Sequence, residues 1–488
     1  MAENKPTAEE IAKAEMAKMQ GDVDTDVDQA AFEEKQREGI RVWVKENLGG
    51  EVTGFTREER WRPQWKVTYT KDGEDLKLFV RGDRPITSPD ILYNEMQILQ
   101  ALDKNGLRVP KVYGWIDEPR AIAMEFVEAD ERDLGYVHTA VDNPTSMTDE
   151  RWLSMLDYMD KLAQMHSIPV DEFTHIKHFR RLETPEEIAL RETERYYRTG
   201  LKTGAIDVML EFIQQWLRRN VPQHRTKDYF IAGDAGQFMS VGPKVTAMSD
   251  FEIAAIGDSH WDLACFRGRH PNENMGDIPA LYRRYAEATG EEVDLPVVCY
   301  HTVNFLQLSV IAAKWFMDPD TRGANYIEGL LETANITRRT YEAIAELLGI
   351  KLDWDLHLPE PEYDIWEDSG LRKMMADIAR LPTSTSFAEW ERHLLEGIPK
   401  FLLNYSRYKT WFEAETVADI NGVTGKDSQD LKSADEAIAE IIAAGDPARD
   451  EEIVRIMHRR MLRFSMLIAG TDPDRENPLF FELEPILG

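Results

Sequence analysis

Hydrophobic and polar residues follow two different periods along the chain. Residues 76–81 alternate between two faces, a pattern that predicts a β-strand. One face of this strand holds Leu76, Leu78 and Val80, and the other holds Lys77, Phe79 and Arg81. The segments before it predict one helix and two strands, over Gln36–Leu48, Glu51–Phe55 and Gln64–Thr70. The chain is therefore expected to begin its folded part with a small antiparallel sheet.

A helix is predicted to follow this sheet. Residues 88–90 read Ser-Pro-Asp, which is typical of a helix N-terminus, and Gly106 favours its end. One face of the helix combines Glu95 with the apolar residues Ile91, Ile98, Leu99 and Leu102. A carboxylate on a buried face needs a cationic partner, and Arg81 is the predicted one, with Lys77 on the same strand face as the competing candidate. The alternative is that Glu95 reaches water from the edge of the apolar face.

The rest of the chain changes from strands to helices. Two further strands are predicted, with a turn at Pro119, and the second of them ends at Met124–Val127. Most later segments have the apolar spacing of amphipathic helices, including those after the Pro- and acid-rich stretch that follows Gly349. This order predicts an α+β protein with a small sheet lobe and a mainly helical lobe.

Two acidic residues flank a predicted hairpin in the middle of the chain. Asp234 follows an apolar run and a glycine, and Asp250 follows the strand Lys244–Met248. That strand and Phe238–Val241 are joined by Gly242 and Pro243, which predicts a hairpin. The two acids are therefore expected to converge. Paired carboxylates at strand ends suit Mg²⁺ binding and the orientation of a hydroxyl nucleophile.

This stretch resembles the aminoglycoside phosphotransferase and choline kinase family of protein-kinase-like small-molecule kinases. That family has a His-Gly-Asp loop followed by an Asn, then an Asp-Trp/Phe-Glu motif and a helix that begins Gly-Asp-x-x-x-Asp-Leu-Ala. The last two motifs are matched by Asp250, Phe251 and Glu252, and by Gly257, Asp258, Asp262, Leu263 and Ala264. The resemblance covers about 300 residues, and one departure is Ala232, which stands where the family has His.

The resemblance implies a bilobal kinase-like fold, with an N-terminal lobe over 38–128 and a C-terminal lobe over 129–349. Residues 1–37 and 350–488 are then an N-terminal extension and a C-terminal helical extension. The resemblance also implies a role for each candidate residue. Asp234 is the expected catalytic residue, which orients the acceptor hydroxyl, and Asp250 is the expected Mg²⁺ ligand. Arg81 is expected to hold the nucleotide phosphates and Glu95 to hold Arg81. The nucleotide base is expected to meet the backbone of Met124, Glu125, Phe126 and Val127. The turn before the second strand carries three arginines, Arg57, Arg60 and Arg62. They either approach the nucleotide phosphates or are solvated.

The loop after Asp234 departs from the family pattern at the position of a second metal ligand. Five residues after Asp234 stands Met239, a thioether and a poor ligand for Mg²⁺. The loop lacks the family's Pro-Gly and reads as two residues shorter, in which case Gln237 takes the Asn position. We favour Gln237, whose amide oxygen suits Mg²⁺.

Two functions from different classes follow. The first is a small-molecule kinase that uses Mg²⁺ to transfer the γ-phosphate of ATP or GTP to a hydroxyl of an unidentified alcohol. The second is a pseudokinase that binds nucleotide or a protein partner without turnover, which the departures in the loop at Ala232 and Gln237 favour.

The composition of the chain argues against several classes of binding partner. The chain has 488 residues, 42% hydrophobic residues and a formal net charge of −31, which argues against a nucleic-acid or anionic-membrane surface. No apolar run reaches the roughly 18 residues that a membrane span needs. The two cysteines give no disulfide framework, and a cytoplasmic protein is expected. Either terminal extension offers a surface for a homodimer.

Overall fold

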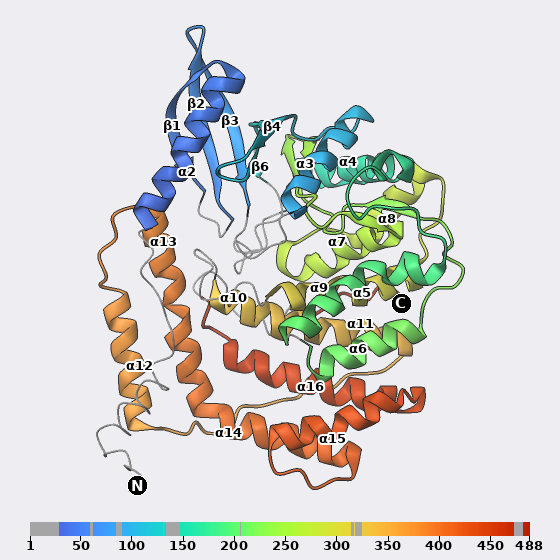
Figure 1. Ribbon diagram of the computed structural model, residues 1–488. Coiled ribbons are helices and arrows are strands. Elements are labelled where there is room, and N and C mark those ends of the chain that lie inside the picture. The colour runs from blue at the N-terminus through green and yellow to red at the C-terminus, as the bar shows by residue number, and fades with distance from the viewer. Residues whose placement is uncertain are drawn as a thin grey trace, which may run out of the picture.

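The computed structural model describes residues 29–58, 62–83, 90–129, 131–132, 147–204, 206–313, 317, 325–472 and 482–488. A sheet lobe lies above a helical lobe, and further helices from the end of the chain lie below and beside both (Figure 1). This arrangement confirms the predicted α+β, kinase-like fold class. Among the helices in these ranges, none combines the length and hydropathy needed to cross a membrane.

The N-terminal lobe is a five-stranded antiparallel sheet with one helix on each side. Its strands in spatial order are β1 (Glu51–Arg57), β2 (Gln64–Lys71), β3 (Glu74–Gly82), β5 (Ala121–Glu125) and β4 (Val112–Ile116). The helices are α2 (Gln29–Trp43), which a π-helical turn extends over Val44–Leu48, and α3 (Asp90–Lys104). Each predicted strand and helix of this lobe is present, with ends that differ by a few residues.

The two faces of β3 lead to different parts of the molecule. Leu78 and Val80 are fully buried in a small core that also contains Ile40 and Val44 of the α2 segment. The opposite face carries Phe79, which packs against the large core that continues from α3 and β5 into the C-terminal lobe. The alternation seen in the sequence therefore separates the core of the sheet lobe from the junction between the lobes.

The C-terminal lobe is mainly helical, as predicted. Its helices are α4 (Asp149–His166), α5 (Pro185–Thr203), α6 (Val208–Arg219), α7 (Ser259–Glu273), α8 (Ile278–Thr289), α9 (Leu295–Ala313), α10 (Tyr326–Leu331) and α11 (Thr337–Leu348). Two small sheets lie at its junction with the N-terminal lobe. One pairs β7 (Tyr229–Ile231) with β10 (Ala255–Gly257), and the other has the order β6 (Glu131–Arg132), β8 (Phe238–Val241) and β9 (Lys244–Met248). The predicted hairpin is thus β8 and β9.

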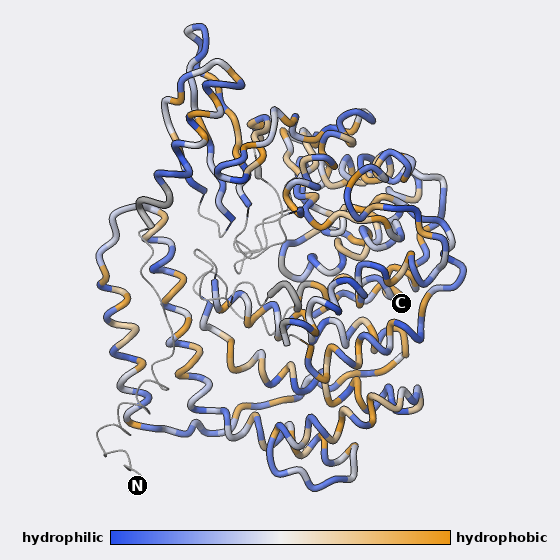
Figure 2. The backbone as a smooth tube through the Cα atoms, viewed as in Figure 1, coloured by the Kyte–Doolittle hydropathy of each residue, from blue (hydrophilic) through white to orange (hydrophobic). Residues whose placement is uncertain are grey.

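The C-terminal extension has two structurally different parts. Its helices are α12 (Ile365–Ile378), α13 (Ser386–Leu395), α14 (Gly397–Thr424), α15 (Leu431–Ala444) and α16 (Asp450–Ile468). Side chains of α15 and α16, including Ile438 and Met457, belong to the same buried cluster as the C-terminal lobe. In contrast, α12 has no buried residue and runs beside α14 as an arm, and hydrophobic residues recur along both helices (Figures 1 and 2). α14 itself also packs against α10 and α16 through Phe401 and Phe412. The Phe387 ring of α13 lies 3.9 Å from the Arg57 guanidinium at the end of β1.

The last residues of the chain return to the C-terminal lobe. Backbone N–H groups of Ile486 and Leu487 each donate to the Glu346 carboxylate at 2.7 Å. Arg267 of α7 also donates to Glu346 and, through Nε, to the carbonyl oxygen of Glu484 at 2.9 Å. Because Arg267 is 1% exposed, Glu346 both anchors the chain end and balances a buried charge.

We expect Glu346→Gln to destabilise the protein by about 1–3 kcal/mol, because it removes the negative charge opposite buried Arg267 and one acceptor of the chain end. The measurement is the thermal unfolding midpoint. Glu292→Gln, at an exposed residue of the loop before α9, is the matched control. Equal midpoints for the two variants would contradict this role of Glu346.

Candidate active site

The loop between β7 and β8 is held by the first turns of α7. The carboxylate of Asp262 accepts the backbone N–H groups of Ala232 and Gly233 at 2.8 and 2.9 Å. The indole N–H of Trp261 donates to the carbonyl oxygen of Gly233 at 2.9 Å. Gly233 has φ +81°, and a Cβ there would lie 2.4 Å from the carbonyl oxygen of Ile253. A glycine is therefore required for this path of the loop.

His166, at the end of α4, helps to position Asp262, which holds this loop. Its Nε2 lies 3.0 Å from Asp262 Oδ2, and its Nδ1 lies 2.7 Å from the Tyr285 hydroxyl. Both His166 and Asp262 are buried. His166 is therefore part of the support of this loop.

Asp234 lies in this loop with both carboxylate oxygens hydrogen-bonded. Arg269 of α7 donates to Oδ1, and the Gln237 side-chain amide donates to Oδ2 at 2.7 Å. Burial raises the pKa of Asp234, the Arg269 charge opposes that rise, and the charge of nearby Asp250 adds to it. The two acids that flank the hairpin therefore lie close enough to influence each other, as the sequence predicted.

The structure distinguishes the two sequence candidates for the second metal ligand. Gln237 immediately precedes β8, and its amide nitrogen donates to Asp234 Oδ2 at 2.7 Å. Met239 lies within β8, where it pairs with Ala247 of β9. Of the two, Gln237 is the side chain that the loop brings to Asp234.

Arg81 joins the predicted residues of the two lobes. Its Nε donates to the buried Glu95 carboxylate of α3 at 2.9 Å, and its Nη2 donates to Asp250. Burial would lower the pKa of Arg81, but the charges of Asp250 and Glu95 outweigh burial and raise it. The competing candidate, Lys77, is largely exposed and pairs with Glu128 at 2.7 Å. The ion pair predicted between Arg81 and Glu95 is thus present.

Arg62 is a second buried guanidinium at this site. It donates to the carbonyl oxygen of Gly82 at 3.0 Å and to the carboxylate of Glu252, two residues after Asp250. Burial, followed by repulsion from Arg81, lowers the pKa of Arg62 to about 9. The alternative of a solvated Arg62 is wrong, since its residue is 3% exposed. Arg60 lies outside the described residues.

The segment expected to meet the nucleotide base, Met124–Val127, comprises the last two residues of β5 and the two that follow it. Met124 is buried, and Glu125, Phe126 and Val127 are partly buried. Both carboxylate oxygens of Glu125 accept from Arg108 at 2.8 Å. The backbone N–H of Glu125 also has a partner, since it donates to the carbonyl oxygen of Lys111 at 2.8 Å.

Arg269 is the residue at this site that sequence reasoning missed. It is seven residues, or about two helical turns, beyond Asp262, so the two share a face of α7. Its side chain is 7% exposed and also pairs with Glu273 at 3.1 Å. The available signal was therefore a second charged residue on the face of the helix that carries Asp262.

The donors at the site fit Mg²⁺. Mg²⁺ prefers oxygen ligands and is commonly held by one or two protein groups together with substrate phosphates. Asp250 offers a carboxylate and Gln237 an amide oxygen, which meets that requirement. No cluster of three or more His, Cys, Asp or Glu residues suited to a metal occurs in the described part of the chain.

The family model for the phosphotransferase enzyme family matches residues 57–298, which include every site residue named above. Residues 57–298 belong to this family. The matched residues therefore include Met124–Val127, the Asp234 loop and most of the segment from α7 to α9. The helices from α10 to α16 lie beyond the matched residues.

Solved structures give distant similarities. An aminoglycoside phosphotransferase in complex with streptomycin and ATP has 13% identity and a TM-score of 0.40, covering 57% of this chain and 88% of that chain. A putative fructosamine-3-kinase from Thermobifida fusca has 21% identity and a TM-score of 0.39, covering 62% and 98%. A Plasmodium vivax ethanolamine kinase has 13% identity and a TM-score of 0.42, covering 69% and 95%. No curated protein matches the chain.

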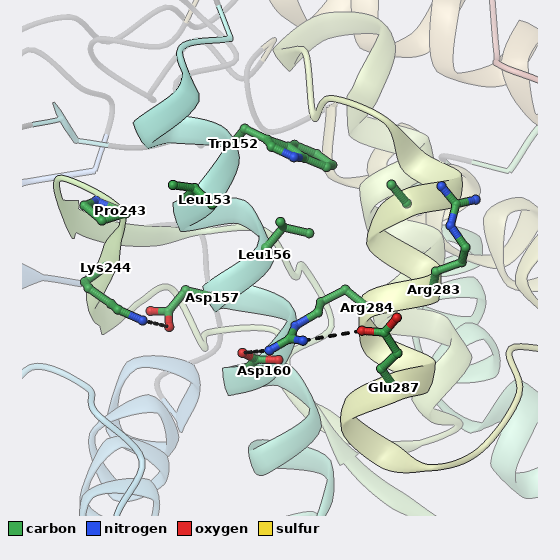
Figure 3. A pocket seen from close by; sticks show the side chains of 11 residues that line it. Trp152, Leu153, Leu156, Asp157, Asp160, Pro243, Lys244, Arg283, Arg284 and Glu287 are labelled. Carbon is green, nitrogen blue, oxygen red and sulfur yellow. Dashed lines mark hydrogen bonds and ion pairs between the residues drawn. The ribbon is translucent and has the colours of Figure 1, made fainter.

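A surface depression lies elsewhere on the C-terminal lobe, between α4, α8 and the β8–β9 turn (Figure 3). Trp152, Leu153 and Leu156 form its apolar side. Charged side chains at its rim pair with one another, as in Lys244 with Asp157 at 3.0 Å and Arg284 with Asp160 at 2.6 Å. This pairing gives the depression no evident preference for a charged ligand.

We expect Gly233→Ala to abolish most activity and to lower stability by about 2–4 kcal/mol, because the new Cβ would meet the backbone of Ile253 at a positive φ. Gly242→Ala is the matched control, since Gly242 has φ +53° and nothing within 4 Å of its added Cβ. That control is expected to cost about 1 kcal/mol. Thermal unfolding midpoints compare the two, and an equal loss would contradict the role of the Ile253 contact.

Proposed function

We propose that this chain is a small-molecule kinase that transfers the γ-phosphoryl group of ATP or GTP to a hydroxyl of a small-molecule alcohol, with Mg²⁺. The observation that carries the proposal is the meeting of Asp234, Asp250 and Arg81 at the junction of the lobes, with Glu95 holding Arg81. Membership of residues 57–298 in the phosphotransferase enzyme family supports it.

In this reaction Asp234 acts on the acceptor. Its carboxylate accepts a hydrogen bond from the acceptor hydroxyl and receives the proton as the hydroxyl oxygen bonds to the γ-phosphorus. The bond from that phosphorus to the β,γ-bridging oxygen breaks, and the nucleoside diphosphate leaves with that electron pair. The buried position of Asp234 and its two hydrogen-bonded partners suit it to orientation of the hydroxyl.

Arg81, Asp250 and Gln237 act on the nucleotide. Arg81 contacts the phosphates, and Glu95 keeps its guanidinium in place when Asp250 exchanges Arg81 for the metal. Asp250 and Gln237 would hold Mg²⁺, which neutralises phosphate charge when bound. The backbone of Met124–Val127 meets the base edge, and the side chains there do not decide between ATP and GTP.

A pseudokinase is the second candidate function, and one observation favours it. Both oxygens of Asp234 already have hydrogen-bond partners in Arg269 and Gln237. If these partners were not compatible with an acceptor hydroxyl, the chain would bind nucleotide without turnover. Turnover of Asp234 variants separates the two functions.

We expect Asp234→Asn to lower kcat by at least about 100-fold, because the amide cannot take the hydroxyl proton. The affinity for ATP–Mg²⁺, measured by isothermal titration calorimetry, is expected to stay within about threefold. Asp117→Asn, in the exposed β4–β5 turn, is the control and should keep full activity. Full activity in the Asp234 variant would exclude its catalytic role, and a wild type that binds but never consumes ATP would favour the pseudokinase.

The homodimer expected from the sequence would use the arm of the C-terminal extension. The structure describes α12 throughout, and none of its residues is buried. Tyr363, Ile365 and Trp366 are 71%, 74% and 82% exposed, an unusual exposure for large apolar side chains. Residues 365–380 carry three acidic and three basic residues, whereas the whole chain has a net charge of −31. A second copy of this neutral segment is therefore the partner that charge repulsion opposes least.

We expect the double variant Ile365→Ser, Trp366→Ser to shift the molar mass in solution from dimer to monomer, because it removes the apolar contact. Size-exclusion chromatography with light scattering measures this. Leu153→Ser, at an exposed residue of α4, is the control. A wild type that is monomeric at all concentrations tested would contradict the homodimer.

A further inference from the structure

Arg269 is a buried guanidinium fixed between two carboxylates. Its Nε donates to Glu273 at 3.1 Å, its Nη2 also pairs with Glu273 at 3.1 Å, and its Nη1 donates to Asp234. Glu273 lies one turn further along α7 and is itself buried. The two contacts to Glu273 fix the plane of the guanidinium, and so they fix the direction of its third contact.

The loop is shaped to pass beside this guanidinium. Gly236 has φ +107°, and a Cβ there would lie 2.8 Å from Met275 Cε and 3.6 Å from Arg269 Cδ. Between Ala232 and Gln237, Asp234 is the one charged residue. The positive charge beside Asp234 therefore comes from α7.

Asp234 also experiences the negative charges of Asp250 and Asp262. Three carboxylates in this small volume repel one another, and Arg269 is the cation in contact with Asp234. Asp250 has Arg81 as its cation, and Asp262 has two backbone N–H groups and His166. The three acids are therefore balanced by separate groups.

We propose that Arg269 is a positioning residue for phosphoryl transfer. Held by Glu273, it fixes Oδ1 of Asp234, while the Gln237 amide fixes Oδ2, so the carboxylate cannot rotate about its side-chain bonds. Each oxygen retains a lone pair, and the acceptor hydroxyl meets a carboxylate of fixed orientation. This inference rests on the proposed kinase function, because the acceptor is what Asp234 is oriented for.

Loss of Arg269 is expected to affect the chemical step more than nucleotide binding. The proposed nucleotide contacts lie on Arg81, Asp250 and Met124–Val127, whereas Arg269 contacts Asp234 and Glu273. A misoriented catalytic group costs about 100-fold in rate. We therefore expect Arg269→Met to lower kcat about 100-fold and to leave the KM for ATP within twofold. Arg269→Lys keeps the charge with a less fixed geometry and is expected to lose about tenfold.

The assay follows ADP production from ATP–Mg²⁺, with water as acceptor and with an alcohol that raises the rate in a screen. Arg267→Met is the matched control, since Arg267 is a buried arginine of the same helix that pairs with Glu346 and the chain end. It should lower the unfolding midpoint but keep kcat within about threefold. An unchanged kcat in a folded Arg269→Met protein, or an equal loss in Arg267→Met, would overturn the proposal.

A second readout is independent of turnover. The thermal unfolding midpoints of Arg269→Met, Asp234→Asn and the double variant form a double-mutant cycle. If Arg269 positions Asp234, the two changes are non-additive. If the wild type turns over no ATP, the kinase function fails, and this cycle alone decides the pairing: additivity overturns it, and non-additivity supports it.

Discussion

The relative position of the two lobes depends on a set of buried guanidinium–carboxylate contacts between them. Arg81 comes from β3 and binds both Glu95 of α3 and Asp250 of the C-terminal lobe. Arg62, just before β2, binds Glu252 in the same loop as Asp250. A buried charge without a partner is strongly disfavoured. These contacts therefore hold the N-terminal and C-terminal lobes in a defined position relative to each other.

Buried ion pairs add little net stability, because the cost of removing charges from water offsets their attraction. Their role here is to position the side chains that the proposed reaction uses. The contacts of Arg81 place Arg81 for the phosphates and Asp250 for the metal in the proposed reaction, and the contact of Arg269 places Asp234 for the acceptor. The proposed reaction therefore uses contacts that the protein can exchange, since bound phosphate and Mg²⁺ would offer new partners to Arg81 and Asp250. Glu95 would keep Arg81 in place during that exchange.

Sequence reasoning predicted the parts of the site that depend on local periodicity. The alternation in β3 and the apolar face of α3 were enough to predict the contact between Arg81 and Glu95, because both residues lie in regular elements. The hairpin, with its Gly-Pro turn, likewise predicted that Asp234 and Asp250 would converge. The environment of Arg62 and Arg269 could not be predicted in this way, because their partners lie 190 and 35 residues away. The packing of α15 and α16 into the core of the C-terminal lobe also depends on tertiary contacts that their amphipathic pattern does not specify.

The central claim is that Asp250 and Gln237 hold the metal while Arg81 contacts the phosphates. The most direct measurement is a crystal structure with a non-hydrolysable ATP analogue and Mn²⁺, which the anomalous signal of the metal locates. We predict a metal peak bonded to Asp250 and to the amide oxygen of Gln237, with Arg81 moved from Asp250 to the phosphates and still bound to Glu95. A bound nucleotide with no metal at these residues, and with the Arg81–Asp250 pair intact, would contradict the account.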